Sequence, residues 1–335
     1  MPGTLFLDWR PHNRRAVCLA EDLGATLHLA PSVLRTKALA PLRYLVLAWR
    51  TLAILLKFRP EVVIASSPPS FCPILAFAYA RAFGRNYVVD AHHLATTGLW
   101  SRIPFGFRFN RFIMREALVT LVHNGRIETM VRAEGIPAIT LETRIPKLRA
   151  DPPEASPGHR FLILAPCSFD PDEPIAEIFE AARSLPDVTF QMTGNPARLD
   201  SKLRAALPAN VVLTGFLSQD RYDELLSTCD AVLAMTTAEY PVRPRAASEA
   251  IAGERPLIAT RNPATESHLG EAAILIENTA VELVKAIEEI RVNFVRYERA
   301  IREIKEVRRQ RYEAELQDLK AILRSAADKA QATSR

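Results

Sequence analysis

Strand and helix patterns alternate along both halves of the sequence, and this alternation constrains the fold more than any other feature. Short apolar runs typical of buried strands are followed by amphipathic stretches of helical length. Such repetition predicts an α/β architecture whose parallel sheets are covered by helices on both faces. The expected strands are residues 4–8, 25–30, 61–65, 87–90 and 118–122 in the first half, and 161–165, 188–192, 211–213, 231–235 and 256–259 in the second.

A segment rich in proline, glycine and small polar residues, 149–159, separates the two halves. It has no hydrophobic period, so we expect it to link two domains. The length of 335 residues suffices for two domains of about 150 residues each. The expected organisation is an N-terminal domain over 1–150, a C-terminal domain over 151–290, and a charged helix and tail over 291–335.

The formal net charge of +5 fits phosphate-bearing ligands, anionic membrane surfaces or nucleic acid without choosing among them. The arginine-rich stretch 291–311 also carries acidic residues at helical spacing. Mixed signs of this kind are typical of a solvated or packing helix, and we expect no nucleic-acid partner.

The most hydrophobic stretch, 42–58, carries Arg43, Arg50 and Lys57 at intervals of seven residues. A membrane-spanning helix needs roughly 20 uninterrupted apolar residues, so this segment is not expected to span. Two interpretations remain. The helix is either buried against a sheet with one solvated stripe, or it has a face that also touches lipid headgroups.

The segment 241–260 reads as a loop, a short helix, a glycine stop and a strand. Arg243 and Arg245 come just before the helix, where free N–H groups and the helix dipole also favour a phosphate. Glu249 lies on the first turn, where its carboxylate can accept two hydrogen bonds from a ribose diol. The simpler alternatives are a solvated loop for the arginines and a favourable interaction with the helix dipole for Glu249.

The order of motifs across 160–276 resembles the C-terminal donor domain of nucleotide-sugar glycosyltransferases, most of all family 4. Gly215-Phe216-Leu217-Ser218 is similar to that family's strand end, and the run from Glu249 to Pro256 is similar to its helix, glycine and strand motif. The resemblance implies the GT-B fold, in which two Rossmann-like, doubly wound domains face each other across a cleft. It also implies a nucleotide-diphosphate sugar as substrate, with neither a cofactor nor a metal requirement.

The resemblance assigns the donor ribose to Glu249, but two of the family's features are absent here. Pro241 stands where the family has a second glutamate, and the loop 166–172 lacks the family's arginine and lysine. Arg243 and Arg245 are therefore the candidates for holding the diphosphate. The remaining expected donor contacts come from strand and helix ends: Ser168, Gly194, Asn195, Gly215, Phe216 and Ser248.

The N-terminal half resembles the acceptor domain of bacterial polysaccharide glycosyltransferases, less specifically, through 59–63, 67–69 and 90–93. Ligands of doubly wound folds bind at the carboxyl ends of the strands, where these turns fall. Asp90, His92 and His93 are the candidate catalytic residues, as a base toward an acceptor hydroxyl or as its orienting partner. No third ligand has metal-type spacing. On the acceptor or phosphate side, the candidates are Arg10, Arg14, Arg15 and Ser67.

The expected function is transfer of a hexose to a polysaccharide or lipid-linked acceptor, in the cytoplasm and at the inner face of the cell membrane. Two alternatives remain open. One is a nucleotide-sugar epimerase of the same fold. The other is a non-catalytic, sugar-nucleotide-binding subunit of a polysaccharide assembly complex, which the missing motif residues favour.

Overall fold

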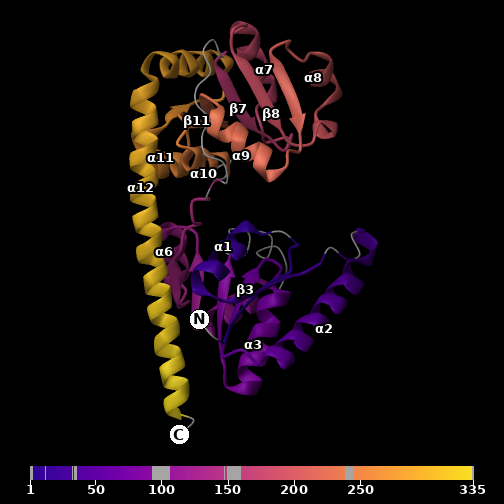
Figure 1. The fold of residues 1–335 in the computed structure, drawn as a ribbon. Helices are drawn as coiled ribbons and strands as arrows, with labels where there is room; N and C mark the ends of the chain where they lie inside the picture. The colour runs from indigo at the N-terminus through magenta and orange to yellow at the C-terminus, as the bar shows by residue number, and fades with distance from the viewer. Residues whose placement is uncertain are drawn as a thin grey trace. The chain divides into compact units, whose positions relative to one another are not determined.

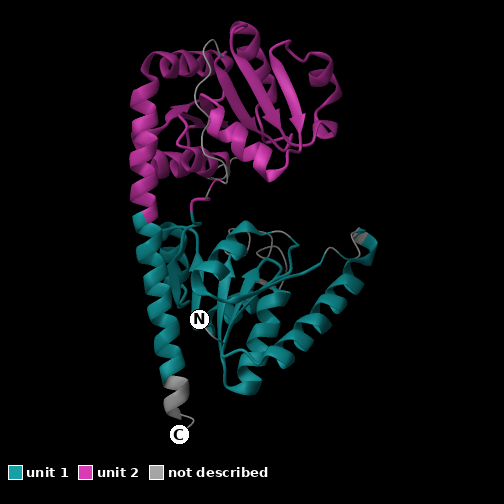
Figure 2. Ribbon diagram, viewed as in Figure 1, with its two compact units in different colours: residues 1–144, 310–335 teal, residues 145–309 magenta. Residues whose placement is uncertain are grey.

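The computed structural model describes residues 3–11, 13–31, 33, 36–92, 106–146, 148, 160–237 and 245–333. The chain forms two compact units (Figure 2). Unit 1 comprises Met1–Arg144 with Gln310–Arg335, and unit 2 comprises Ile145–Arg309. Among the described residues, no helix combines the length and the apolar character needed to cross a membrane.

Unit 1, whose strand β3 is labelled in Figure 1, contains a six-stranded parallel sheet in the order β2-β1-β3-β4-β5-β6. Its strands are β1 (Thr4–Asp8), β2 (Thr26–Leu29), β3 (Val62–Ser67), β4 (Asn86–Ala91), β5 (Val119–Val122) and β6 (Ala138–Thr140). The order reverses at β1, which pairs with β2 on one side and β3 on the other. A doubly wound sheet opens its ligand crevice at such a reversal, at the carboxyl ends of the strands.

Helices cover both faces of this sheet, because alternate strand residues point in opposite directions. The helices of this unit are α1 (Arg14–Leu23), the 3₁₀ turn η1 (Lys37–Leu39), α2 (Ala40–Phe58), α3 (Phe71–Phe83), α5 (Gly106–Arg115) and α6 (Gly125–Ala133). Leu5 and Leu7 join one core with α2 and α3, whereas Phe6 joins the other with α1.

Unit 2 repeats the architecture with the order β12-β11-β10-β7-β8-β9, again parallel throughout. Its strands are β7 (Leu162–Pro166), β8 (Thr189–Thr193), β9 (Val211–Gly215), β10 (Ala231–Ala234), β11 (Leu257–Thr260) and β12 (Ile274–Ile276). Its shorter helices are α7 (Ile175–Ser184), η3 (Pro196–Arg198), α8 (Ser201–Ala205), α9 (Gln219–Thr228), α10 (Arg245–Gly253), α11 (Pro263–Leu269) and η4 (Gly270–Ala272). The predicted pair of parallel, doubly wound sheets is confirmed.

One long helix, α12 (Ala280–Thr333), contributes to both units. Its backbone leaves helical geometry at Asn293. From residue 310 onward it belongs to unit 1, where its apolar residues enter the core beside α1. The last part of the helix therefore completes the first unit.

Candidate functional site

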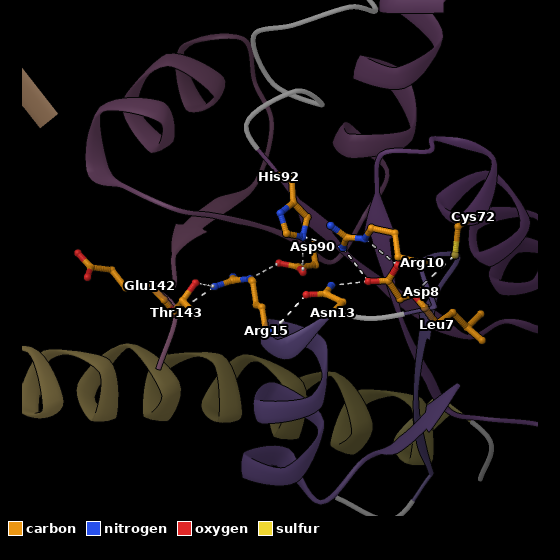
Figure 3. Close-up of polar contacts among 10 residues, drawn as sticks. All are labelled: Leu7, Asp8, Arg10, Asn13, Arg15, Cys72, Asp90, His92, Glu142 and Thr143. Atoms are coloured by element: carbon orange, nitrogen blue, oxygen red, sulfur yellow. Dashed lines mark hydrogen bonds and ion pairs between the residues drawn. The ribbon is translucent and has the colours of Figure 1, made fainter. Parts of the chain in front are cut away.

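Charged side chains gather at the carboxyl ends of β1 and β4 in unit 1 (Figure 3). Asp8 is the last residue of β1, and Asp90 lies one residue before the end of β4. Both aspartates are buried: 1% of the surface of Asp8 is exposed, and 0% of that of Asp90. Buried carboxylates need compensating donors, and arginines supply them here.

Asp8 organises the loop between β1 and α1. Arg10 donates through Nε to Oδ1 at 2.9 Å and through Nη2 to Oδ2 at 2.7 Å. The Arg10 backbone N–H also donates to Oδ1, and the side-chain amide of Asn13 donates to Oδ2. Asn13 in turn caps α1 by accepting from the backbone N–H of Arg15 at 3.1 Å. One carboxylate thus fixes both the loop and the start of the helix.

Arg15 holds Asp90. Its Nε donates to Asp90 Oδ1 at 3.0 Å, and its Nη1 donates to the backbone carbonyl of Glu142 at 3.0 Å. Burial raises the pKa of Asp90, but the charges of Arg15, His92 and His123 lower it by more, so the pKa lies below its ordinary value. Asp90 is therefore ionised at neutral pH. Only 6% of Arg15 is exposed, which makes this predicted phosphate ligand an internal partner of Asp90 instead.

His92 follows β4 directly and is about a quarter exposed. Its Nε2 lies 2.8 Å from Nη2 of Arg10 and 3.7 Å from Oδ2 of Asp90. A guanidinium can only donate, so Nε2 accepts and the proton of the neutral ring is on Nδ1. Burial lowers the pKa of His92, Asp90 raises it, and Arg10 and Arg15 lower it, with a net value below the ordinary one. His92 is thus a neutral, accessible base beside a buried anion.

His123 follows β5 and lies against His92, with ring centroids 5.0 Å apart. His123, Asp8 and Asn13 were not among the site residues expected from the sequence. The signal was present, because all three lie at or just beyond the carboxyl ends of predicted strands. His93, the third predicted catalytic residue, lies outside the described residues.

The two other predicted residues of unit 1 lie near this cluster in the fold. Ser67 ends β3 and is fully buried, with its hydroxyl 3.4 Å from that of Ser70. Its backbone carbonyl accepts from the N–H of His92 at 2.8 Å, which ties the ends of β3 and β4 together. Arg14 is half-buried at the first position of α1.

In unit 2, Glu249 of α10 is 6% exposed, and Tyr222 of α9 donates its hydroxyl to Glu249 Oε2. The carboxylate is thereby held in one orientation. Ser248 beside it is half-buried. Arg245 begins α10, but its side chain and all of Arg243 lie outside what the structure describes.

The loop after β7 wraps around a carboxylate of its own. Glu173 accepts from the backbone N–H groups of Ser168, Phe169 and Asp170 at 2.7–3.3 Å, and from the Ser168 hydroxyl at 3.0 Å. Successive N–H groups of this kind form a concave anion site, which an internal anion occupies here. The hydroxyl of Ser168, a predicted donor contact, therefore stabilises its own loop.

The remaining predicted donor residues lie where β8 and β9 end. Gly194 has φ +107° and donates its N–H to the carbonyl of Gly215, whose φ is +72°. Asn195 caps η3 by accepting from the N–H of Ala197 at 3.1 Å. Phe216 is 83% exposed, so its ring is accessible for stacking. Among the described residues, no group of three or more His, Cys, Asp and Glu side chains could hold a metal ion.

Replacing Gly194 with alanine is expected to destabilise unit 2 more than replacing Gly215. Both have positive φ, a conformation that costs a residue with a Cβ about 1–2 kcal/mol. A Cβ at Gly194 would also lie 2.0 Å from the carbonyl oxygen of Cys167, whereas nothing lies within 4 Å of one at Gly215. Thermal unfolding of both variants measures the difference. Equal losses of stability in the two variants would contradict the close approach of the loop at Gly194 to the loop at Cys167.

Solved structures share this architecture over nearly the whole chain. A sucrose-phosphate synthase from Thermosynechococcus elongatus superposes with a TM-score of 0.71 at 15% identity, covering 97% of this chain and 99% of that one. HepE of Anabaena, in complex with UDP-glucose, gives 0.68 at 14% identity, covering 98% and 99%. The chain has the GT-B fold.

The GT-B fold is shared by proteins with different activities. A protein from Listeria monocytogenes assigned as a UDP-N-acetylglucosamine 2-epimerase superposes with a TM-score of 0.60 at 14% identity, covering 89% of this chain and 90% of that one. No protein-family model matches the sequence, and neither does any curated protein. The likeness thus establishes the fold, and function has to be argued from the site.

Proposed function

We propose that the chain is a metal-independent glycosyltransferase that moves a hexose from a nucleotide-sugar to a polysaccharide or lipid-linked acceptor in the cytoplasm. The main support is the likeness of both units, over 98% of the chain, to a protein whose structure holds UDP-glucose. Unit 2 would bind the donor and unit 1 the acceptor. Each supplies polar groups at the carboxyl ends of its strands, where this class of sheet binds ligands.

In the proposed donor site, Glu249 accepts hydrogen bonds from the ribose diol. Tyr222 fixes its carboxylate beforehand, which reduces the ordering needed on binding. Arg245 begins α10, so the free N–H groups and dipole of that helix would add to its charge in holding the diphosphate, with Arg243 beside it. The same groups would stabilise the departing nucleoside diphosphate during transfer.

In the proposed acceptor site, Nε2 of His92 takes the proton of the acceptor hydroxyl as its oxygen attacks the sugar. The hydroxyl has to replace Nη2 of Arg10 at this nitrogen, and the Arg10 side chain is about a third exposed. Asp90, 3.7 Å away, then stabilises the imidazolium that forms. The bond between the sugar and the diphosphate breaks, and the proton stays on His92 until the product leaves.

Epimerisation is the second candidate, because the likeness to the Listeria protein covers both units. Incubation with a labelled nucleotide-sugar in the absence of acceptor distinguishes the two activities. An epimerised product would favour the epimerase. A non-catalytic subunit, which the internal anion at the β7 loop favours, would bind the donor without turnover and co-purify with another enzyme.

Glu249→Gln is expected to weaken donor binding about tenfold or more, since a hydrogen bond to a charged group contributes about 1.5–3 kcal/mol. Thermal stabilisation by UDP-glucose and a panel of other nucleotide-sugars measures the affinity. Glu254→Gln is the matched control, because Glu254 lies on the same segment but pairs with Arg302 and Lys305. Donor affinity that is unchanged in Glu249→Gln would exclude Glu249 from the donor site.

A further inference from the structure

The helix α2 has an exposed apolar stripe along its whole length. Positions three or four residues apart, which lie on one side of a helix, are 38–75% exposed: Leu42, Leu45, Trp49, Leu52 and Leu56. The opposite side packs into the unit 1 core through Leu47, Thr51 and Leu55. The helix is therefore apolar on both sides, and only one side is covered by the protein.

The stretch of sequence that contains this stripe is basic and has no acidic residue. Residues 25–60 contain six of the chain's 43 Lys and Arg residues and none of its 38 Asp and Glu residues. The net charge of +5 would become −1 without this segment, so the chain's whole positive excess lies here. Arg43 and Lys57 lie over the rings of Tyr44 and Phe58, with long side chains that can reach a charged layer above an apolar one.

The positive charge of this segment indicates which partner the apolar stripe binds. A second copy of the chain would bring the same positive charge to it, whereas an anionic bilayer offers negative headgroups above an apolar layer. We infer that α2 lies in the headgroup region of an anionic membrane, with the stripe from Leu42 to Leu56 inserted among the acyl chains. Binding of this kind needs no membrane-spanning segment, since the helix lies parallel to the surface.

Direct contacts connect α2 to the proposed acceptor site. The indole N–H of Trp9, the residue after Asp8, donates to the Thr51 hydroxyl at 2.9 Å. A small cavity of about 60 Å³ beside them is lined by Asp8, Trp9 and Arg50 among others. If the proposed function holds, docking through α2 would bring the end of β1 to the surface on which a lipid-linked acceptor is presented.

Sedimentation with vesicles tests the inference, using the full chain without donor or acceptor. The wild type is expected to bind vesicles of phosphatidylcholine with phosphatidylglycerol, and to bind pure phosphatidylcholine at least tenfold more weakly. Leu45→Gln with Trp49→Gln is expected to weaken binding to the anionic vesicles at least tenfold. Arg43→Gln with Lys57→Gln is expected to weaken it about tenfold at low salt and less at high salt.

The matched control is Val292→Gln with Val295→Gln, which changes two valines of α12 that are 79% and 64% exposed and should bind as the wild type does. Because none of these positions is buried, the thermal midpoints should change little. Wild type that stays in solution, or a Leu45/Trp49 variant that sediments like it, would overturn the inference. The inference would also be overturned if the wild type formed dimers without binding vesicles and the Leu45/Trp49 variant no longer dimerised. Donor binding, measured without vesicles, tests the proposed function separately.

Discussion

Replacing Arg15 with methionine is expected to destabilise unit 1 by about 3–5 kcal/mol at neutral pH, because the change leaves the buried Asp90 carboxyl without the guanidinium that compensates its charge. Methionine keeps much of the side-chain volume, so the loss would reflect charge more than packing. Tryptophan fluorescence during denaturant unfolding reports on this unit alone, since Trp9, Trp49 and Trp100 all lie before residue 145.

The pH dependence of Arg15→Met gives a second test of the pair. In the wild type the pKa of Asp90 is lowered, so its stabilising effect is complete above the unfolded value and is lost as pH falls through the folded one. In the variant, burial dominates and the pKa rises. The stability difference should therefore be largest at neutral pH and shrink as pH falls from the raised pKa of the variant to the lowered pKa of the wild type.

The control for Arg15→Met is Arg132→Met, which breaks a pair with Glu128 on α6 in which Arg132 is 57% and Glu128 23% exposed, and also a hydrogen bond to the carbonyl of Ala138. A pair of this kind contributes about 0–1 kcal/mol and the hydrogen bond about 0.5–1.5 kcal/mol, so the loss should be smaller than in Arg15→Met and should depend less on pH. Equal losses in the two variants, or a difference that persists in acid, would contradict an ionised Asp90 held by Arg15.

Replacing His92 with glutamine is expected to lower kcat about 10²–10⁴-fold, the usual contribution of a general base. Donor affinity should not change, because the proposed donor groups all belong to unit 2. Steady-state transfer rates, with thermal stabilisation by the donor as control, separate the two effects. Full activity in His92→Gln would remove His92 from the mechanism.

Arg10→Met tests the electrostatics that keep His92 neutral. Burial lowers the pKa of His92, and the Arg10 charge lowers it further. A base must be deprotonated, so activity should fall as pH drops through the pKa of His92. Without Arg10 that pKa rises, and the acidic limb of the pH–rate profile should move to higher pH. A limb that does not move would assign the titration to another group.

Much of this arrangement could be predicted from sequence, because periodicity encodes buried strands directly. The predicted parallel sheets are present, and Asp90 and His92 lie at and just after the end of β4, where the patterns put them. Glu249 lies in the middle of α10, one turn later than expected, because the helix already begins at Arg245. The short strands β6 and β12 were not expected. Each has three residues, too few for a run of apolar residues to stand out from a loop.

Other features depend on packing, which one sequence does not reveal. An arginine in the first turn of a helix is typical of a surface charge, and only the fold brings Arg15 to Asp90, 75 residues away in sequence. The interpretation of 42–58 depended in the same way on which side of the helix the sheet covers. The structure leaves an apolar stripe uncovered, which favours contact with lipid headgroups over a helix with only a solvated polar stripe.

The path of α12 has a consequence for the order in which the chain can fold during synthesis. Tyr312, Leu316, Leu319 and Leu323 fill the core beside α1, although the ribosome makes them after all of unit 2. The core of unit 1 therefore remains incomplete, with apolar surface exposed, until unit 2 has been synthesised. A released chain that ends at residue 309 should bind chaperones through its N-terminal lobe, even when its C-terminal lobe is native.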